Sequence, residues 1–354
     1  MEKKSEILFT EVEGIDGNLG LITLNRPEVM NALNQAMFVA LGKHLKKWAA
    51  DSHIKAVVIQ AAEGRAFCAG GDIRSAYERK LENDPTLPDF FGEEYRLNKC
   101  IYHFPKPYIA LMDGITMGGG VGISIHGSHR VATERFVFAM PETRIGFYPD
   151  IGASYFLSRL PHKIGLYLGL TGARLAYNDC LELGIVNHVV ARDSFPKIIE
   201  LLAQTSLDKH ADATVSELIN QFTRATEKSN FMFHQTEIQT CFSKKTVETI
   251  IDALEHYPSA WCEEVTNMLI LASPTSLKVT LRQLQEGEKL TFDDCMKLEY
   301  RLTNRFLKSH DFFEGVRAAI IDKDNKPQWQ PAALGDVKAE DIDLYFAPLS
   351  KELI

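Results

Sequence analysis

The spacing of apolar residues divides the chain into two regions of different character. In the first region, apolar positions that share one face predict a helix that Asn34 caps and that runs to about Ala50. Short apolar runs bounded by glycine and polar residues predict strands, the first two of which form a predicted β-hairpin. Strands interleaved with helices indicate an α/β layer fold. The predicted strands are 7–12, 19–24, 55–60, 109–112, 130–133 and 137–140.

Helical spacing dominates the second region. We expect helices at 215–222, 247–254, 260–271, 277–285 and 292–307, and shorter ones at 155–160, 165–170 and 179–183. A length of 354 residues suits about two domains. We therefore predict an α/β core over residues 1–207 and a helical C-terminal region over residues 208–354.

Charge and cysteine content narrow the class of protein. The net charge of -8 offers no basic stripe for nucleic acid, and the uncharged run 114–128 is too short to cross a membrane. The six cysteines form no CxxC pair, so we expect free thiols in a reducing compartment. The acidic residues within 1–14 argue against a transit peptide. We expect a cytoplasmic protein, or a mitochondrial matrix protein whose presequence has been removed.

Several chemical signatures are absent or incomplete. The glycines of 118–122 do not form GxGxxG, and no GxxxxGK[ST] loop is present. His126 and His129 are three residues apart but lack a nearby carboxylate or cysteine, which argues against a metal. Cys68 has no histidine partner in the sequence that would activate it as a nucleophile. We therefore expect neither a metal nor a cofactor.

Three segments together suggest carbonyl chemistry. The glycines of 66–72 and 116–122 let backbone N–H groups approach a ligand, and two N–H groups on one carbonyl oxygen form an oxyanion hole. The third segment, 140–150, places Glu142 and Asp150 beside proline and glycine turns. Two carboxylates near an oxyanion hole suit acid–base or nucleophilic work on a carbonyl compound.

These segments resemble the enoyl-CoA hydratase/isomerase (crotonase) superfamily. The resemblance implies a crotonase-like ββα spiral, an acyl-CoA substrate bound by the 1–207 core, and an oxyanion hole made by the N–H groups of Ala69 and Gly119. A helix that begins near Gly119 would add positive potential at the thioester oxygen. The residues that carry the resemblance are ITLNRPEVMNA (22–32), FCAGGD (67–72), DGITMGGGVG (113–122) and PETRIG (141–146).

A second set of residues resembles the 3-hydroxyisobutyryl-CoA hydrolase group of this superfamily. The resemblance implies hydrolysis of a short 3-hydroxyacyl-CoA thioester in valine degradation, with Glu142 as nucleophile or general base. Asp150 would bind the substrate hydroxyl or assist the water, and Glu94 would contact that hydroxyl or hold Glu142. Gly119 completes the implied substrate-binding set. The quoted stretches are FFGEEY (90–95), SPTSLKVTL (273–281) and DFFEGVRAAIIDKD (311–324).

One position departs from the hydratase pattern and defines the alternatives. Hydratases carry a glutamate three residues after the middle glycine of GGG, where this chain has Gly122. Without that carboxylate, Glu142 alone cannot serve both sides of a hydration. An enoyl-CoA hydratase or a dienoyl-CoA isomerase stays the alternative activity, because the isomerase can carry a similar glutamate–aspartate spacing. An RNA-binding or scaffold protein on the same fold is the non-enzymatic alternative, which the acidic charge disfavours.

Two further questions stay open at the level of sequence. The 3-hydroxyisobutyryl and 3-hydroxypropionyl groups differ by one methyl, which a pocket discriminates by only about 1–3 kcal/mol. For assembly, the resemblance implies either a homo-oligomer, often a trimer, or C-terminal helices that cover the chain's own site.

Overall fold

The computed structural model describes residues 5–229 and 231–353. The chain forms two compact units, each built from three separate segments. We call them the sheet unit (1–71, 96–138 and 175–230) and the helical unit (72–95, 139–174 and 231–354). The predicted boundary at residue 207 differs from this division, because it lies inside the last segment of the sheet unit. A boundary between two continuous stretches cannot describe units whose segments interleave.

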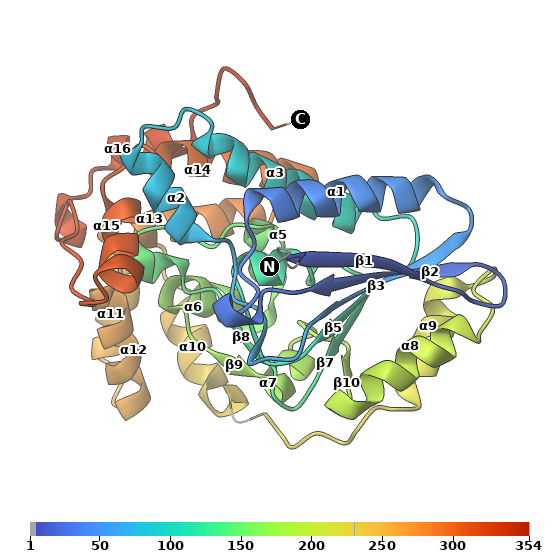
Figure 1. The fold of residues 1–354 in the computed structure, drawn as a ribbon. Coiled ribbons are helices and arrows are strands. Elements are labelled where there is room, and N and C mark those ends of the chain that lie inside the picture. The colour runs from blue at the N-terminus through green and yellow to red at the C-terminus, as the bar shows by residue number, and fades with distance from the viewer. Residues whose placement is uncertain (1–4, 230, 354) are drawn as a thin grey trace. The chain divides into compact units, whose positions relative to one another are not determined.

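Two sheets form the frame of the sheet unit (Figure 1). The larger sheet has the strand order β1-β2-β3-β5-β7-β10; β1 and β2 pair antiparallel, and the other neighbours pair parallel. The smaller sheet has the order β4-β6-β8-β9. The predicted hairpin is confirmed, with Ile7 opposite Leu24. The strands are β1 (Ile7–Val12), β2 (Asn18–Leu24), β3 (Ile54–Ala61), β4 (Ala66–Cys68), β5 (Tyr108–Met112), β6 (Ile115–Met117), β7 (His129–Ala132), β8 (Val137–Ala139), β9 (Leu175–Ala176) and β10 (His188–Val189).

Helices cover both faces of the larger sheet, because successive strand residues point to opposite sides. Gly20 faces α1, where a Cβ would lie 2.6 Å from the Trp48 ring, whereas its neighbour Leu19 joins a core with α8 and α9. Figure 1 shows α1 on one side of the strands and α8 and α9 on the other. As predicted, Asn34 caps α1 by accepting the N–H of Met37. The helices are α1 (Gln35–Ala50), α4 (Gly119–Gly122), α7 (Tyr177–Glu182), α8 (Phe195–Ala203) and α9 (Ala211–Asn220), with 3-10 turns η1 (Pro27–Val29) and η5 (Arg192–Ser194).

The helical unit is formed from short turns and amphipathic helices. The helices predicted at 247–254, 260–271, 277–285 and 292–307 are confirmed as α11 to α14. Within the described residues, no helix is both long and apolar enough to cross a bilayer. The elements are η2 (Glu142–Ile145), α5 (Ala153–Phe156), η3 (Leu157–Arg159), η4 (Pro161–Lys163), α6 (Ile164–Thr171), η6 (Phe231–His234), α10 (Gln235–Cys241), α11 (Val247–Glu255), α12 (Ala260–Leu271), α13 (Pro274–Gly287), α14 (Phe292–Phe306), α15 (Asp311–Val316), the π-turn η7 (Arg317–Ile321), η8 (Leu334–Asp336) and α16 (Ala339–Phe346).

Two helices occupy a stretch for which the sequence predicted no regular element. They are α2 (Ile73–Leu81) and α3 (Leu87–Tyr102). The α2 helix buries one residue, Ala76, so it has almost no apolar face that a periodic pattern could reveal. Asp72 starts it by accepting the N–H of Ser75 at 3.4 Å. The cap was present in the sequence, but the apolar period was not.

Candidate active site

Two glycine-rich segments of the sheet unit approach each other backbone to backbone. They follow the parallel strands β4 and β6, where Cys68 pairs with Thr116. A Cβ on Gly120 would lie 2.2 Å from the Cys68 carbonyl oxygen, so a side chain at this position would collide with main chain. A Cβ on Gly70 would lie 3.5 Å from the backbone nitrogen of Gly119. The two segments predicted to form an oxyanion hole are therefore adjacent.

The amides at this contact differ in their availability. The N–H of Ala69 donates to the carbonyl oxygen of Met30 at 3.0 Å, so this predicted donor is already used. Within the described residues, the N–H groups of Gly71 and Gly119 donate to no acceptor. Gly119 opens the single turn α4, whose first amides have no partner inside the turn. Gly119 is thus available for its predicted role, and the geometry favours Gly71 over Ala69 beside it.

Three buried carboxylates of the helical unit form what we call the acid cluster: Glu94, Glu142 and Asp150. Glu94 lies on α3, Glu142 opens η2, and Asp150 lies in the loop before α5. Their exposed fractions are 3%, 6% and 5%. In the part of the chain that is described, Oε1 of Glu94 and Oε2 of Glu142 have no hydrogen-bond partner. All three predicted acids are therefore buried, and two of them hold an unpaired oxygen.

Burial shifts the protonation of all three acids. It raises the pKa of Glu142 and the pKa of Glu94 well above their usual range, and repulsion from Asp150 adds to both rises. Burial also raises the pKa of Asp150 to about 7, against a hydrogen bond from Tyr95 that lowers it. A carboxyl group such as Asp150, with a pKa near neutral pH, is typical of acid–base catalysis.

The turn that carries Glu142 is held by the C-terminal helices. The N–H of Ser273, which precedes α13, donates to the carbonyl oxygen of Thr143 at 3.2 Å. A Cβ on Gly146 would lie 2.1 Å from a carbonyl oxygen of α15, and a Cβ on Gly315 would lie 2.3 Å from the backbone of η2. Two glycines thus bring turn and helix into main-chain contact. The C-terminal motifs that carried the second resemblance support the turn of Glu142.

The loop that carries Asp150 is strained and tightly held. Ile151 has φ of +56°, a conformation that costs about 1–3 kcal/mol in a residue other than glycine. Glu299 of α14 accepts the N–H of Gly152 at 2.7 Å and the N–H of Ser154 at 2.9 Å. Glu299 is fully buried, and burial raises its pKa to about 8. These two bonds keep the loop in the conformation that presents Asp150.

Hydroxyl groups that the sequence did not single out surround Asp150. The Tyr95 hydroxyl donates to Oδ2 of Asp150 at 2.7 Å and lies 2.5 Å from Oγ1 of Thr303. The Tyr148 hydroxyl lies 3.3 Å from that of Tyr95 and donates to the carbonyl oxygen of Glu299 at 2.5 Å. Both tyrosines lie within two residues of a predicted acid, and this was the available sequence signal.

Two other candidates from the sequence, Cys68 and His129, form hydrogen bonds within the sheet unit. The Cys68 thiol donates to the carbonyl oxygen of Asn31 at 3.1 Å. The ring nitrogens of His129 lie 2.9 Å from the Ser128 hydroxyl and 3.0 Å from the Ser216 hydroxyl. Across residues 5–229 and 231–353, no group of three or more His, Cys, Asp or Glu residues is arranged to hold a metal ion.

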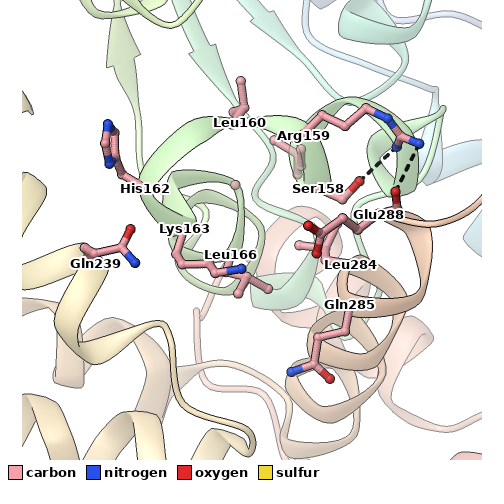
Figure 2. A pocket seen from close by; sticks show the side chains of 12 residues that line it. Ser158, Arg159, Leu160, His162, Lys163, Leu166, Gln239, Leu284, Gln285 and Glu288 are labelled. Carbon is pink, nitrogen blue, oxygen red and sulfur yellow. Dashed lines mark hydrogen bonds between the residues drawn. The ribbon is translucent and has the colours of Figure 1, made fainter.

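A separate pocket of about 360 Å³ opens in the helical unit (Figure 2). Arg159, His162 and Lys163 line it together with the exposed Glu288. The Arg159 guanidinium donates to carbonyl oxygens at the end of α13, among them that of Glu288 at 3.3 Å, so this cation already has partners. No member of the acid cluster lines the pocket. The candidate active site therefore lies at the acid cluster and not in this pocket.

Comparison with known proteins decides the family. The family model described as Enoyl-CoA hydratase/isomerase matches residues 19–346. The chain belongs to the enoyl-CoA hydratase/isomerase family. It is 46% identical over 336 residues to the mitochondrial 3-hydroxyisobutyryl-CoA hydrolase of Rattus norvegicus and 45% identical over 336 residues to that of Homo sapiens. Each match covers 94% of this chain and 87% of the relative.

Solved structures of related proteins extend the likeness to the fold. A carnitinyl-CoA dehydratase from Mycobacterium thermoresistibile has a TM-score of 0.90 at 35% identity, and both chains are 99% covered. An enoyl-CoA hydratase from Rhodobacter sphaeroides 2.4.1 has a TM-score of 0.87 at 36% identity, with 98% of both chains covered. The predicted fold class, an α/β crotonase-like fold with a helical C-terminal region, is confirmed. The C-terminal helices are part of the shared architecture.

Proposed function

We propose that the protein hydrolyses a short 3-hydroxyacyl-CoA thioester, chiefly 3-hydroxyisobutyryl-CoA to 3-hydroxyisobutyrate and CoA. The acid cluster is the observation that carries this proposal, because it offers Glu142 with an unpaired buried oxygen and Asp150 held by Tyr95. The relatives at 45–46% identity are named for this hydrolysis. Gly122, in place of a second hydratase glutamate, supports hydrolysis over hydration.

Glu142 is the proposed reacting group, in one of two ways. As a nucleophile, its carboxylate forms a bond to the thioester carbon, the C–S bond breaks, and CoA leaves as a thiolate that takes up a proton; water then splits the anhydride. As a general base, Glu142 takes a proton from a water molecule that adds to the same carbon before CoA leaves. Both routes require the deprotonated carboxylate, so the raised pKa of Glu142 makes the rate increase with pH.

Hydroxylamine separates these two routes. It converts an acyl–glutamate anhydride into a hydroxamate at Glu142, which mass spectrometry of the peptide detects during turnover. A hydroxamate at Glu142 supports the nucleophile. Continued turnover with no hydroxamate at Glu142, and with no protein-dependent hydroxamate of the acyl group, supports the general base, because hydroxylamine can attack either carbonyl of the anhydride. Glu288→Ala serves as the matched control, because Glu288 is exposed and lies outside the acid cluster.

The thioester oxygen is the proposed ligand of the free amides. Gly119 N–H is retained from the sequence prediction, and Gly71 N–H takes the place of Ala69 N–H, which is bonded to Met30. One such donor commonly contributes about 10²–10³ in rate. Asp150 is proposed to accept the hydrogen bond of the substrate 3-hydroxyl, and Glu94 to contact that hydroxyl or hold Glu142.

The decisive experiment measures free CoA thiol and enoyl absorbance in the same cuvette. The substrates are 3-hydroxyisobutyryl-, 3-hydroxypropionyl-, crotonyl- and dienoyl-CoA. Thiol release from the hydroxyacyl esters, without an enoyl change, supports the hydrolase. An enoyl or dienoyl change without thiol release would replace it with the hydratase or isomerase, the activities in the names of several structural relatives. The ratio of the two hydroxyacyl rates measures the preference for the methyl group.

The proposed activity also implies a binding partner and a cellular compartment. The acyl-CoA ester is the proposed partner, rather than a nucleic acid or a membrane. All six cysteines are free thiols, so we propose a reducing compartment. The relatives are named as mitochondrial, and the mitochondrial matrix is such a compartment.

A further inference from the structure

The hydroxyl of Tyr95 is aimed at one oxygen of Asp150. Tyr95 is fully buried on α3, and its hydroxyl donates to Oδ2 of Asp150 at 2.7 Å. The ring is fixed by packing against Phe91 and Tyr300, with 6.5 Å between ring centres in both pairs. A buried donor that cannot swing away fixes the orientation of its acceptor. One carboxylate oxygen of Asp150, Oδ2, is thus held by the Tyr95 hydroxyl.

The protons of this network can be assigned from its donors and acceptors. The single hydroxyl proton of Tyr148 goes to the carbonyl oxygen of Glu299, and that of Tyr95 goes to Asp150. Thr303 lies 2.5 Å from the Tyr95 oxygen and 2.7 Å from the Tyr148 oxygen, so its hydroxyl supplies the proton for one of these contacts. This assignment needs Asp150 to be an acceptor. The hydrogen bond from Tyr95 lowers the pKa of Asp150 and thus favours its ionised form.

The other two acids of the cluster lack such support. Glu94 and Glu142 each have one buried oxygen without a partner among the described residues. The titratable groups that interact with Asp150 are all acids or phenols, and they come from α3, from the segment 142–148 and from α14. They are Glu94, Tyr95, Glu142, Tyr148 and Glu299. Among these groups, only a hydroxyl donor can stabilise a negative Asp150.

We propose that Tyr95 is a positioning residue that holds Asp150 as an oriented carboxylate, so that Asp150 accepts the 3-hydroxyl of the substrate and selects hydroxyacyl over plain acyl esters. This inference rests on the proposed function and adds the residue that sets its specificity. A site that provides an acceptor for a substrate hydroxyl discriminates against the analogue that lacks it, because the buried acceptor is then left unpaired. Tyr95 acts through Asp150 and does not touch the reacting atoms.

The test compares two esters that differ by one hydroxyl. Full-length wild-type protein and Tyr95→Phe are assayed by thiol release with 3-hydroxyisobutyryl-CoA and isobutyryl-CoA between pH 5.5 and 8.5. For the hydroxy ester, we expect KM of Tyr95→Phe to rise about fivefold at pH 7 and about tenfold at lower pH, the effect of about one unit of pKa. The pH below which KM rises should move up by about one unit. We expect kcat to stay within about threefold, and KM for isobutyryl-CoA within about twofold.

Tyr148→Phe is the matched control. It removes a hydroxyl from the same network, but this hydroxyl donates to the carbonyl oxygen of Glu299 and not to Asp150. We expect its KM values to stay within about twofold of wild type for both esters. An equal rise of KM in Tyr148→Phe, or an equal loss for both esters in Tyr95→Phe, would overturn the inference in favour of a packing role.

A second readout does not depend on turnover. Protein labelled with ¹³C at aspartate carboxyl carbons is titrated by NMR, and Asp150→Asn assigns the signal. The midpoint of Asp150 should rise by about one unit in Tyr95→Phe. An unchanged midpoint overturns the inference even if the protein is a hydrolase. If wild type releases no thiol from any hydroxyacyl ester, the proposed function fails separately, while the NMR titration still tests the Tyr95–Asp150 bond.

Discussion

Two buried glutamates of the helical unit illustrate opposite uses of the same side chain. Glu299 accepts one backbone N–H at each carboxylate oxygen, from Gly152 and Ser154. Glu142 has an oxygen, Oε2, with no partner among the described residues. Burial raises the pKa of both groups. Their difference therefore lies in their bonding rather than in their burial.

This difference fits a structural role for Glu299 and the reacting role that we propose for Glu142. Both carboxylate oxygens of Glu299 accept backbone N–H groups, and these hydrogen bonds hold the loop that carries Asp150. An unpaired buried acceptor costs about 1–3 kcal/mol, and a fold retains it where it is compensated elsewhere. The unpaired oxygen of Glu142 is free to meet a reacting atom.

The largest effect is expected at Glu142. Glu142→Gln keeps the size of the side chain but cannot act as a base or nucleophile, so kcat should fall by about two to four orders of magnitude. Its melting temperature should stay unchanged or rise, because the substitution removes a buried acid that burial penalises. Thiol release and thermal melting measure the two properties. Glu288→Gln is the control. Full turnover by Glu142→Gln would contradict the proposed role of Glu142 as the reacting group.

The second largest effect is expected in the pH dependence of the free energy of unfolding, to which Glu299 contributes. The folded-state pKa of Glu299 is raised from 4.5 to about 8, so between these values the folded state binds more protons than the unfolded state. The contribution of Glu299 to stability is therefore fully present below about pH 4.5 and is lost as the pH rises towards 8. This loss is at most about 1.4 kcal/mol per pH unit. Asp150, raised from 3.8 to about 7, has the same sign. Melting temperatures of wild type and Glu299→Gln between pH 5 and pH 8 isolate the contribution of Glu299, because buried His129 and His188, whose pKa values burial lowers, contribute with the opposite sign in both proteins. An equal pH dependence in the two proteins would contradict this expectation.

Glu299→Gln should lower stability more than activity. The amide nitrogen of glutamine cannot accept an N–H, so one bond to the strained loop is lost, at about 1–3 kcal/mol. For a region of this size, each kcal/mol lowers the melting temperature by about 2–4 °C. The rate should fall less than tenfold, because both oxygens of Glu299 are bonded to the loop. Differential scanning calorimetry and the thiol assay report the two effects, and a rate loss as large as that of Glu142→Gln would remove the distinction.

The smallest effect is a shift in the pH profile. Repulsion from Asp150 is the second cause of the raised pKa of Glu142, after burial. Asp150→Asn removes that charge, so the acidic limb of kcat should move to lower pH by about half a unit to one unit, even though the maximal rate falls. The comparison is the kcat–pH profile of wild type against the variant. A shift to higher pH would mean that Glu142 does not control this limb.

Local patterns predicted those parts of the fold that local physics determines. The helix expected at 260–271 is α12, residue for residue, and the Asn34 cap begins α1. The α2 helix was missed because its single buried residue leaves no apolar period, so tertiary packing decides its structure. The sequence also did not reveal that each unit consists of three separate segments, because the periodicity of apolar residues does not report which segments pack together.

The candidate site was predictable at its motifs and not at its supports. Glu142 lies in PETRIG (141–146), a segment that carries the resemblance, and Asp150 follows four residues after it. Their supports come from distant parts of the chain: Tyr95 and Thr303 are 208 residues apart and meet at one hydrogen bond. The bond from Ala69 to Met30 had no sequence signal either, and it withdraws a donor that the motif alone assigns to the ligand.

The main-chain contact between the turn of Glu142 and α15 has a consequence for synthesis on the ribosome. Gly146 and Gly315 allow that contact, and Gly315 is translated long after Glu142. At about 5–20 residues per second, the turn waits roughly 10–35 s for the helix that completes its support. A nascent chain therefore contains Glu142 before the helix that supports its turn has been made. The contact that supports the turn of Glu142 therefore forms only near the end of translation.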